Sequence, residues 1–380
     1  MTAFGLTAPQ GTLFGRGTRD AAAGRLAAIG RRVVLVRGRA VAWVDDLHDA
    51  LIGQDCTVET VVSRGEPDLH AVRQGVAAAR AHSADCVVAV GGGAVIDLGK
   101  AIAGLCPSAG DVADYLPSDG TPARQIADPL SMVAIPTTAG TGAEATRNAV
   151  IGVPQDRAKI SLRDARLVPD LAIVDPALTD GAPRGLTLAS GLDAITQLIE
   201  SALSCRATPI TDALTRAALP PAIAALEILM RAEDPAARDD MARASYLSGL
   251  ALANSGLGVV HGLASIIGGR GGAHGAICGR LLPAALEGNM AALRARGLAT
   301  TRISEIDALL SQQLGDGQQD GRKALCGFVD GHGLPTLAGL GVGAEDKTQV
   351  AHKALSASST RANPVPLTEN EIAEILDRTD

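Results

Sequence analysis

The sequence predicts an α/β domain followed by an all-helical domain. In the first half, short β-branched runs alternate with helix-like segments, and after about Leu186 these runs stop. The chain has 380 residues, whereas a single hydrophobic core rarely grows beyond about 250–300 residues. We therefore expect two domains, an α/β domain over residues 1–185 and a helical domain over residues 186–380.

The first domain is expected to contain a parallel sheet. Its strands are apolar runs bounded by Gly, Pro or polar residues, and the Ala-rich segment 68–84 between two of them has helical spacing. Strand–helix–strand repetition is typical of a parallel sheet covered on both faces. The expected strands are 31–36, 56–62, 85–90, 131–136 and 171–175.

The second domain is expected to consist of Ala- and Leu-rich helices. One stretch, Ala244 to Gly269, carries no charged residue and is long enough to span a bilayer. Glycines and polar residues interrupt it, so we interpret it as a buried helix pair with a tight turn near Ser255-Gly256. The expected helices are 188–204, 208–231, 235–253, 257–268, 276–295, 302–314, 319–332, 344–358 and 368–377.

Composition argues against several classes of function. The net charge is −7 without clustered Lys and Arg, and aromatic residues make up 2%, so we expect no nucleic-acid partner. The N-terminus lacks the pattern of a signal peptide, and we expect a cytoplasmic protein. The cysteines lie far apart without a C-x-x-C pair, which indicates small buried apolar residues rather than a disulfide or zinc framework. They are Cys56, Cys86, Cys106, Cys205, Cys278 and Cys326.

Two glycine-rich loops each follow an expected strand. The first contains Gly91–Gly93 and opens a helix, and the second, 135–146, carries several threonines. Free N–H groups at a helix start favour phosphate, and open α/β sheets bind ligands beyond the carboxyl ends of their strands. The loops lack the G-x-G-x-x-G pattern, so plain tight turns are the alternative to a nucleotide site.

The second half holds a candidate metal site. Asp193 and Gln197 are four residues apart on one helix face, and His261 and His274 lie in apolar, Gly-rich segments. A carboxylate and two histidines are suitable ligands for a divalent metal. On spacing alone, however, Ser190 as an N-cap with Asp193 in the first turn is the favoured interpretation, and a buried histidine is usually a hydrogen-bonded core residue.

Eight segments in the same order resemble the iron-containing, or group III, alcohol dehydrogenase family over nearly the whole chain. The resemblance implies the dehydroquinate synthase-like fold of that family: an N-terminal dinucleotide-binding domain, a C-terminal helical domain and an active site in the cleft between them. The matching segments are 12–17, 91–102, 135–146, 158–179, 190–201, 259–269, 273–283 and 362–372.

The resemblance also implies roles for particular residues. The family's metal ligands, one Asp and three His, map onto Asp193, Gln197, His261 and His274, and a further family histidine near the nicotinamide maps onto Ser265. A neutral amide is a weak ligand, so we expect loosely bound iron or zinc, or no metal, as in the similar maleylacetate reductases. The catalytic residues would be Asp193, His261 and Ser265. The residues expected to face the cofactor are Gly38, Gly92, Gly93, Asp97, Thr137, Thr138, Thr141 and Lys159.

The function expected from this resemblance is reversible, metal-assisted hydride transfer between NAD or NADP and a small alcohol or carbonyl compound. Alternatives are a metal-independent reductase similar to maleylacetate reductase and a scaffold that binds cofactor without catalysis. A lyase similar to dehydroquinate synthase would need basic residues for a substrate phosphate, and Arg270 and Arg280 are too few. We expect a homo-oligomer, most simply a dimer.

The end of the second strand bears on cofactor choice. Relatives that prefer NAD place an Asp there, whereas this chain has Gly38 between Arg37 and Arg39. Without the carboxylate, a 2′-phosphate is not repelled, and a guanidinium can pair with it. We therefore expect NADP(H) to be accepted at least as well as NAD(H), the alternative being that both arginines point to solvent.

Overall fold

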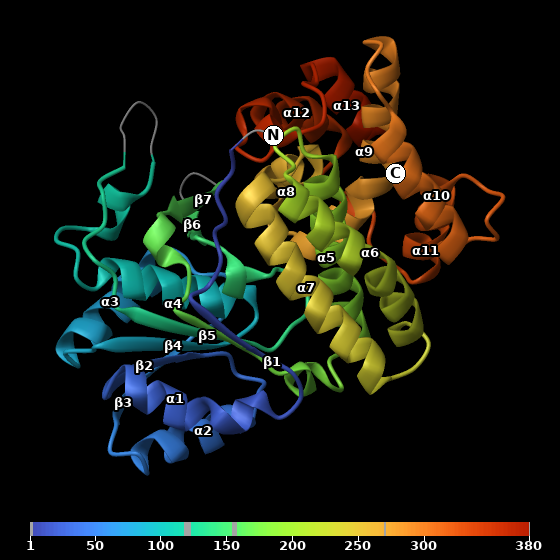
Figure 1. Cartoon of the computed structure of the whole chain (residues 1–380). Coiled ribbons are helices and arrows are strands. Elements are labelled where there is room, and N and C mark those ends of the chain that lie inside the picture. The colour runs from blue at the N-terminus through green and yellow to red at the C-terminus, as the bar shows by residue number, and fades with distance from the viewer. Residues whose placement is uncertain (1–2, 118–122, 154–157, 270, 380) are drawn as a thin grey trace. The chain divides into compact units, whose positions relative to one another are not determined.

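The computed structural model describes residues 3–117, 123–153, 158–269 and 271–379 (Figure 1). The chain divides into two compact units, one formed by Thr7–Asp180 and the other by Gly181–Asp380 together with Met1–Leu6. All strands of the described residues belong to the first unit, which ends shortly before the first long helix of the second. The predicted fold class, a parallel-sheet domain followed by a helical domain, is confirmed.

The first unit is built on a six-stranded parallel sheet with the order β1-β8-β5-β4-β2-β3. The five predicted strands are all present, each within one residue of its expected bounds. Chain connections run outward from β2 to β3 in one direction and from β4 to β5 in the other, so the topological switch point lies between β2 and β4. The strands are β1 (Gly11–Phe14), β2 (Arg32–Arg37), β3 (Thr57–Val62), β4 (Cys86–Gly91), β5 (Ser131–Pro136) and β8 (Leu171–Val174).

Helices cover both faces of this sheet (Figure 1). Because side chains alternate along a strand, Val33 and Leu35 pack in one apolar core with α1 and α2, while Val34 and Val36 pack in the other with α3 and α4. Burial on both faces explains why the strands are continuous apolar runs. The helices are α1 (Ala22–Ile29), α2 (Trp43–Ile52), α3 (Leu69–Ala81) and α4 (Gly93–Leu105).

Three strands of the first unit were not predicted. β1 has only four residues and pairs with β8. The antiparallel hairpin of β6 (Asn148–Val153) and β7 (Ala158–Arg163) pairs polar Asn148 with charged Arg163 at one end and contains a glycine within β6. These strands are stabilised by partners and surroundings that local sequence patterns do not encode.

The second unit is all-helical, and each predicted helical segment is present. The helix α5 packs against α6, α7 and α9 and is buried along most of its length (Figure 1). The helices are α5 (Arg184–Leu203), α6 (Pro209–Leu229), α7 (Pro235–Ser255), α8 (Val259–Gly268), α9 (His274–Ala295), α10 (Thr301–Leu314), α11 (Gly321–Gly331), α12 (Lys347–Ser356) and α13 (Glu369–Asp377).

The interpretation of Ser190 as an N-cap is wrong. The helix α5 begins at Arg184, directly after Pro183, and Ser190 lies in its interior, where its hydroxyl donates to the carbonyl of Leu186 at 2.8 Å. Asp193 is therefore not a first-turn acid that satisfies backbone amides. Its buried carboxylate needs partners from other elements.

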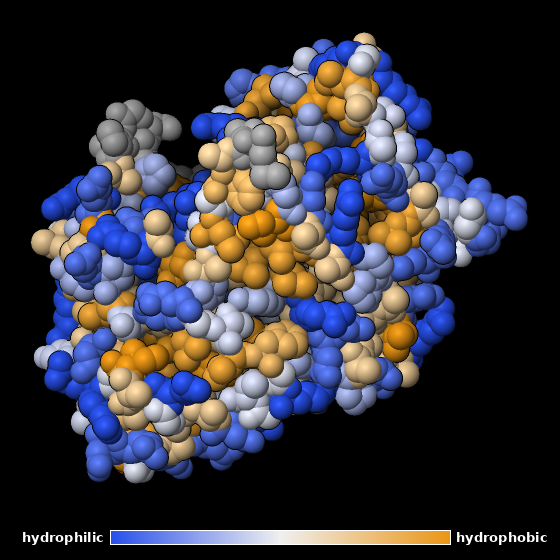
Figure 2. Space-filling model, viewed as in Figure 1, coloured by the Kyte–Doolittle hydropathy of each residue, from blue (hydrophilic) through white to orange (hydrophobic). Residues whose placement is uncertain are grey.

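The charge-free stretch forms the predicted helix pair. The helix α7 ends at Ser255, Gly256 adopts a left-handed φ of 73°, and α8 begins at Val259. On the face shown in Figure 2, hydrophobic residues gather over the region of α7 and α8. Among the described residues, no single helix is both long enough and apolar enough to span a membrane. The helices α7 and α8 together have the length and composition of a span, but they are bent by 102° relative to each other.

Candidate functional site

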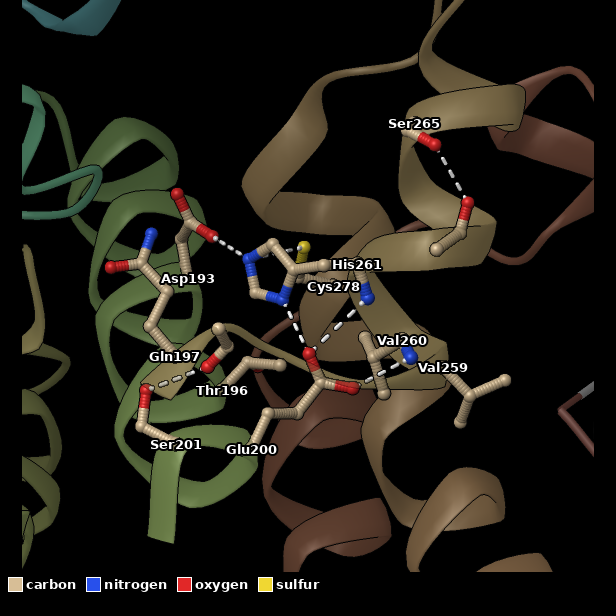
Figure 3. A network of polar contacts seen from close by, with 12 residues as sticks. Asp193, Thr196, Gln197, Glu200, Ser201, Val259, Val260, His261, Ser265 and Cys278 are labelled. Atoms are coloured by element: carbon tan, nitrogen blue, oxygen red, sulfur yellow. Dashed lines mark hydrogen bonds and ion pairs between the residues drawn. The ribbon is translucent and has the colours of Figure 1, made fainter. Parts of the chain in front are cut away.

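Four potential metal ligands converge within the helical unit. Asp193 comes from α5, His261 from α8, and His274 and Cys278 from the first two turns of α9. One ligand atom from each lies within 4.8 Å of all the others. Figure 3 shows the carboxylate of Asp193 and the thiol of Cys278 both facing the same nitrogen of the His261 imidazole. The residues are brought together from α5 and from the consecutive helices α8 and α9, which follow more than 50 residues later in the sequence.

The ligand atoms of this cluster lie at contact distance from one another. The Nε2 of His261 lies 3.3 Å from Oδ1 of Asp193 and 3.7 Å from Sγ of Cys278. The Nε2 of His274 lies 3.8 Å from the same carboxylate oxygen and 3.7 Å from the same sulfur. Both imidazoles thus direct one nitrogen at one carboxylate and one thiol, and Asp193 and His261 are almost completely buried.

Opposite charges stabilise one another in the cluster. Burial alone would lower the pKa of His261, but Cys278 and Asp193 outweigh it and raise that pKa well above 6.5. Burial raises the pKa of the Cys278 thiol, yet the two histidines bring it below its usual value. Burial likewise opposes ionisation of Asp193, and His274 and His261 lower its pKa. Two anionic donors beside two imidazoles fit a divalent cation, which would take the place of the imidazolium protons.

Glu200 orients the His261 ring. Its Oε2 lies 2.7 Å from Nδ1 of His261, on the side of the ring away from Asp193 (Figure 3). The same carboxylate accepts the backbone N–H groups of Val260, at 2.7 Å, and His261, at 3.3 Å, and so caps α8. A neutral imidazole that donates from Nδ1 presents its Nε2 lone pair to the cluster, an arrangement common behind metal-binding histidines.

Gln197 and Ser265 have partners of their own. The buried carboxamide oxygen of Gln197 accepts a hydrogen bond from the Ser248 hydroxyl at 2.7 Å. The Ser265 hydroxyl donates to the carbonyl of Gly262 at 2.7 Å, along its own helix (Figure 3). The metal-ligand role of Gln197 and the catalytic role of Ser265 both stay predictions.

The basic residues considered for a substrate phosphate lie elsewhere. The guanidinium of Arg280 donates to the Asp330 carboxylate at 2.6 Å and to the backbone carbonyls of Pro335 and Leu334. Arg270 lies outside the described residues. Since Arg280 is engaged by the fold, it offers no support for a lyase that binds a sugar phosphate.

In the first unit, the loops predicted to bind a dinucleotide lie side by side. The pairs Arg37–Val90 and Gly91–Pro136 are in register, so Gly38, Gly92 and Thr137 all leave the same edge of the sheet. Gly38 and Gly92 flank the switch point between β2 and β4, which is where ligands bind in open α/β sheets. The helix α4 begins at this edge with Gly92 as its N-cap and no side-chain cap.

The two glycine-rich loops are packed against each other. A Cβ on Gly92 would lie 3.2 Å from the Thr138 hydroxyl, and one on Gly93 would lie 2.7 Å from Thr141. Lys100, fully buried one helical turn beyond Asp97, donates to the carbonyls of Ala143 and Thr146 at 2.5 and 2.6 Å. Threonines of the second loop therefore occupy the space that side chains at Gly92 and Gly93 would need.

Two further predicted cofactor contacts have local partners. The ammonium of Lys159 pairs with the carboxylate of Glu66. Arg37, next to Gly38, pairs with Asp45. A role for Lys159 at the nicotinamide ribose stays a prediction, and cofactor binding there would have to share or displace the Glu66 pair.

Sequence reasoning missed Cys278, which belongs to the cluster, and Glu200, which lies behind it. Cys278 was interpreted as a small apolar residue, and this is wrong for its surroundings, because its thiol faces two histidines and a carboxylate. Its position four residues after His274 was the available signal, since residues i and i+4 share a helix face. Glu200 lies seven residues after Asp193, again on one face. The prediction that the cysteines are buried was also wrong for Cys205 and Cys326, which are exposed.

Comparison with known proteins identifies similar sequences over the whole length. The family described as iron-containing alcohol dehydrogenase matches residues 9–176, and the C-terminal domain of the Fe-containing alcohol dehydrogenase family matches residues 187–379. An NAD-dependent methanol dehydrogenase of Bacillus methanolicus is 31% identical, with 97% of each chain covered. Long-chain-alcohol dehydrogenase 1 of Geobacillus thermodenitrificans is 36% identical over 82% of this chain and 79% of its own.

Solved structures agree with these matches. A crystal structure of 1,3-propanediol oxidoreductase superposes with a TM-score of 0.88 at 29% identity, with 100% of both chains covered. An iron-containing alcohol dehydrogenase from Thermotoga maritima has a TM-score of 0.85 at 25% identity, with 99% of both chains covered. The two-unit architecture is thus shared along the whole chain.

Proposed function

Because the chain belongs to the iron-containing alcohol dehydrogenase family, we propose that it is an enzyme that transfers a hydride between a nicotinamide cofactor and a small alcohol or its carbonyl product. The observation that carries this proposal is the convergence of Asp193 and His261, which are buried, and His274, which is half-buried, in the helical unit. The glycine-rich edge of the sheet in the other unit supplies a place for the dinucleotide.

The two parts of the chain divide the work. Residues 1–185 bind the dinucleotide, with Gly92, Gly93 and the α4 N-terminus facing the diphosphate, where main-chain N–H groups and the helix dipole favour negative charge. Asp97, Thr137, Thr138, Thr141 and Lys159 complete this surface in the proposal. The bound cofactor supplies the hydride acceptor or donor, and the protein provides orientation.

Residues 186–380 hold the divalent metal and the substrate. Asp193, His261 and His274 are its ligands, and the sequence offers Gln197 as the fourth. A bound divalent metal polarises the substrate oxygen and favours loss of the alcohol proton. Glu200 holds His261 in the orientation that this requires. The Ser265 hydroxyl, bonded to its own helix, can at most relay a proton after it rotates.

Small alcohols are the proposed substrate class. Relatives at 31% identity include an NAD-dependent methanol dehydrogenase and a 1,3-propanediol dehydrogenase, whose names state short alcohols. A long-chain-alcohol dehydrogenase is also among the relatives, so chain length is the property to be tested. We further propose a cytoplasmic homodimer, on the grounds of composition and family resemblance.

The test separates chemistry from cofactor binding. Asp193→Ala and His261→Ala are each expected to abolish most turnover of alcohols with NAD(P)⁺, while NADH binding, measured by fluorescence titration, is kept because the cofactor residues belong to the other unit. Ser265→Ala is expected to have a smaller effect. Turnover at the wild-type rate in both of the first two variants would refute the metal-assisted proposal.

A metal-independent reductase similar to maleylacetate reductase is the second candidate, favoured by Gln197 at a position where the family carries a ligand. It predicts carbonyl reduction that survives exhaustive chelation. If the chain is a scaffold without catalytic activity, it should bind NADH but turn over no alcohol, aldehyde or keto acid. A substrate panel measured before and after chelation distinguishes the three.

A further inference from the structure

The proposed metal site lacks one of the family's histidines but contains an additional thiol. Gln197 takes the place of the missing histidine, and Cys278 lies in the cluster with Asp193, His261 and His274. We propose that Cys278 supplies the fourth protein ligand of the metal, and that the resulting Asp–His–His–Cys set selects zinc over ferrous iron. This inference rests on the proposed function only in assuming that the cluster binds a metal.

The spacing of the donor atoms matches a tetrahedral site. With metal–nitrogen and metal–oxygen bonds of about 2.1 Å and a zinc–sulfur bond of about 2.3 Å, tetrahedral angles place nitrogen roughly 3.4 Å from oxygen and roughly 3.6 Å from sulfur. Asp193 Oδ1 lies 3.3 and 3.8 Å from the two Nε2 atoms. Cys278 Sγ lies 3.7 Å from each. These four distances are within about 0.4 Å of the tetrahedral values, and the other two pairs of donor atoms, Asp193–Cys278 and His261–His274, lie within 4.8 Å.

The elements that carry the donors explain how the replacement works. In the family pattern, two ligands four residues apart lie on α5, at the positions of Asp193 and Gln197. In this chain His274 and Cys278 are the pair at i and i+4, on α9. The carboxamide oxygen of Gln197 accepts from Ser248 instead. A second ligand on α9 therefore restores the number of protein ligands to four.

The chemistry of the donors favours zinc. Thiolate is a soft ligand that suits zinc in mixed nitrogen and sulfur sites, whereas carboxylate and imidazole alone discriminate less. One carboxylate and one thiolate also neutralise a divalent ion in a buried position, where an unbalanced charge is unfavourable. The expectation of loose metal binding assumed Gln197 as the fourth ligand, and with Cys278 in that role we expect one tightly held equivalent.

Cobalt substitution reports on the thiolate directly. Purified full-length protein is stripped with a chelator, loaded with one equivalent of Co²⁺ and examined by absorption spectroscopy. A thiolate ligand produces an intense near-ultraviolet charge-transfer band, which oxygen and nitrogen ligands do not. We expect this band in the wild type and its loss in Cys278→Ser, which keeps the size of the side chain but removes the sulfur.

Matched variants separate ligation from folding. Gln197→Ala should keep the band, and so should Cys205→Ala, which removes an exposed thiol outside the cluster. Circular dichroism of the metal-free variants checks that each is folded. If Cys278→Ser fails to fold, Cys278→Ala replaces it. The double variant Gln197→His/Cys278→Ala, which restores one Asp and three His, should bind cobalt without the band.

Competition and activity complete the test. Metal-free wild type given equal Zn²⁺ and Fe²⁺ under anaerobic conditions should retain zinc, and the zinc-to-iron ratio should fall in Cys278→Ser. Bound cobalt without a charge-transfer band in the wild type would overturn the inference, as would a band that persists in Cys278→Ser. Since these readouts need no substrate, a band in a protein inactive on every alcohol would contradict the proposed function and leave the ligand assignment standing.

Discussion

Glu200 accepts a hydrogen bond from Nδ1 of His261 at 2.7 Å and also caps the helix on which His261 lies. One carboxylate thus holds both the imidazole ring of His261 and the backbone of the first turn of α8. The absence of a side chain at Gly258 makes this contact feasible, because a Cβ there would lie 2.7 Å from Oε1 of Glu200. Glu200 is a positioning residue behind the cluster.

We predict that Glu200→Gln lowers metal affinity roughly 10- to 100-fold, the usual effect of losing a hydrogen-bonded carboxylate behind a ligating histidine. The amide keeps an oxygen to cap α8, so the fold should persist. Competition with a chromophoric chelator measures the affinity. Glu374→Gln, at an exposed ion pair on α13, is the control and should have no effect. Equal affinities in the wild type and Glu200→Gln would contradict the positioning role.

The packing between the two glycine-rich loops gives a second prediction. A Cβ on Gly93 would lie 2.7 Å from both Oγ1 and Cγ2 of Thr141, so Gly93→Ala must push the loops apart. Overpacking of this kind costs about 1–3 kcal/mol, and if binding of the cofactor needs the unperturbed loops, the NADH dissociation constant should rise roughly 5- to 160-fold. Gly24→Ala, in α1 with open space around it, is the matched control. Unchanged NADH binding in Gly93→Ala would remove this loop from the cofactor site.

The sequence predicted what local periodicity encodes. The strands around Val33–Val36 and Val87–Val90 are apolar on both faces, and the helical domain repeats Ala and Leu at helical spacing, so these elements were found within a few residues. By contrast, β1 exists because it pairs with β8, which lies far along the chain. A pairing of that separation leaves no local signal in a four-residue segment.

The site was predicted in part for the same reason. The resemblance located Asp193, His261 and His274, but the spacing of residues cannot show which side chains from separate helices meet. The spacing of His274 and Cys278 puts them on one helix face, but only the packing of α5, α8 and α9 shows that Cys278 and Glu200 face His261. The cap assigned to Ser190 failed because a serine followed by an acid three residues later also occurs inside a helix, where the hydroxyl bonds the preceding turn.

The surroundings of Gly38 refine the prediction on cofactor choice. Arg37 donates to the carbonyl of Gly38 at 3.2 Å and pairs with Asp45, so its guanidinium is held by the fold. Arg39 is exposed. A Cβ on Gly38 would meet Val95 at an ordinary 3.7 Å, so a side chain is tolerated there. Arg39 is accordingly the residue expected to recognise a 2′-phosphate.

We predict that Gly38→Asp shifts preference toward NADH, because a carboxylate repels the 2′-phosphate and accepts from a 2′-hydroxyl. Arg39→Ala should weaken NADPH binding by about 1.5–3 kcal/mol, the usual contribution of a hydrogen bond to a charged group, and leave NADH binding almost unchanged. Dissociation constants for both reduced cofactors are measured by fluorescence. Clearly tighter binding of NADH than NADPH to the wild type would refute the proposed preference.

The pair of Lys100 and Glu144 gives a prediction about pH. Both side chains are buried, Glu144 within the second loop and Lys100 on α4 next to that loop. Burial raises the pKa of Glu144 to about 7 from 4.5, despite the nearby Lys100 ammonium. Burial lowers the pKa of Lys100 to about 8 from 10.5, although Asp97 and Glu144 oppose this. The fold therefore favours the neutral form of each group relative to the unfolded chain.

The sign of each contribution follows from proton binding. Between pH 4.5 and 7 the folded chain keeps the Glu144 proton that the unfolded chain has lost, so stability present at acid pH falls as pH rises. Between pH 8 and 10.5 the unfolded chain binds the Lys100 proton more strongly, so stability rises again with pH. Ionisation of Glu144 thus lowers the free energy of unfolding as the pH rises from acid to neutral.

We predict that Glu144→Gln removes the acidic part of this dependence, since the amide resembles the protonated carboxyl at every pH. The free energies of unfolding of the wild type and Glu144→Gln should be similar near pH 4.5, and the variant should become the more stable of the two as pH approaches 7. Urea unfolding at a series of pH values measures the difference, and using the difference cancels the titrating groups that do not interact with Glu144, while Lys100 stays protonated over this range. A difference that stays constant from pH 4.5 to 7 would show that Glu144 is already ionised in the folded state at acid pH, in which case the Lys100 ammonium outweighs its burial.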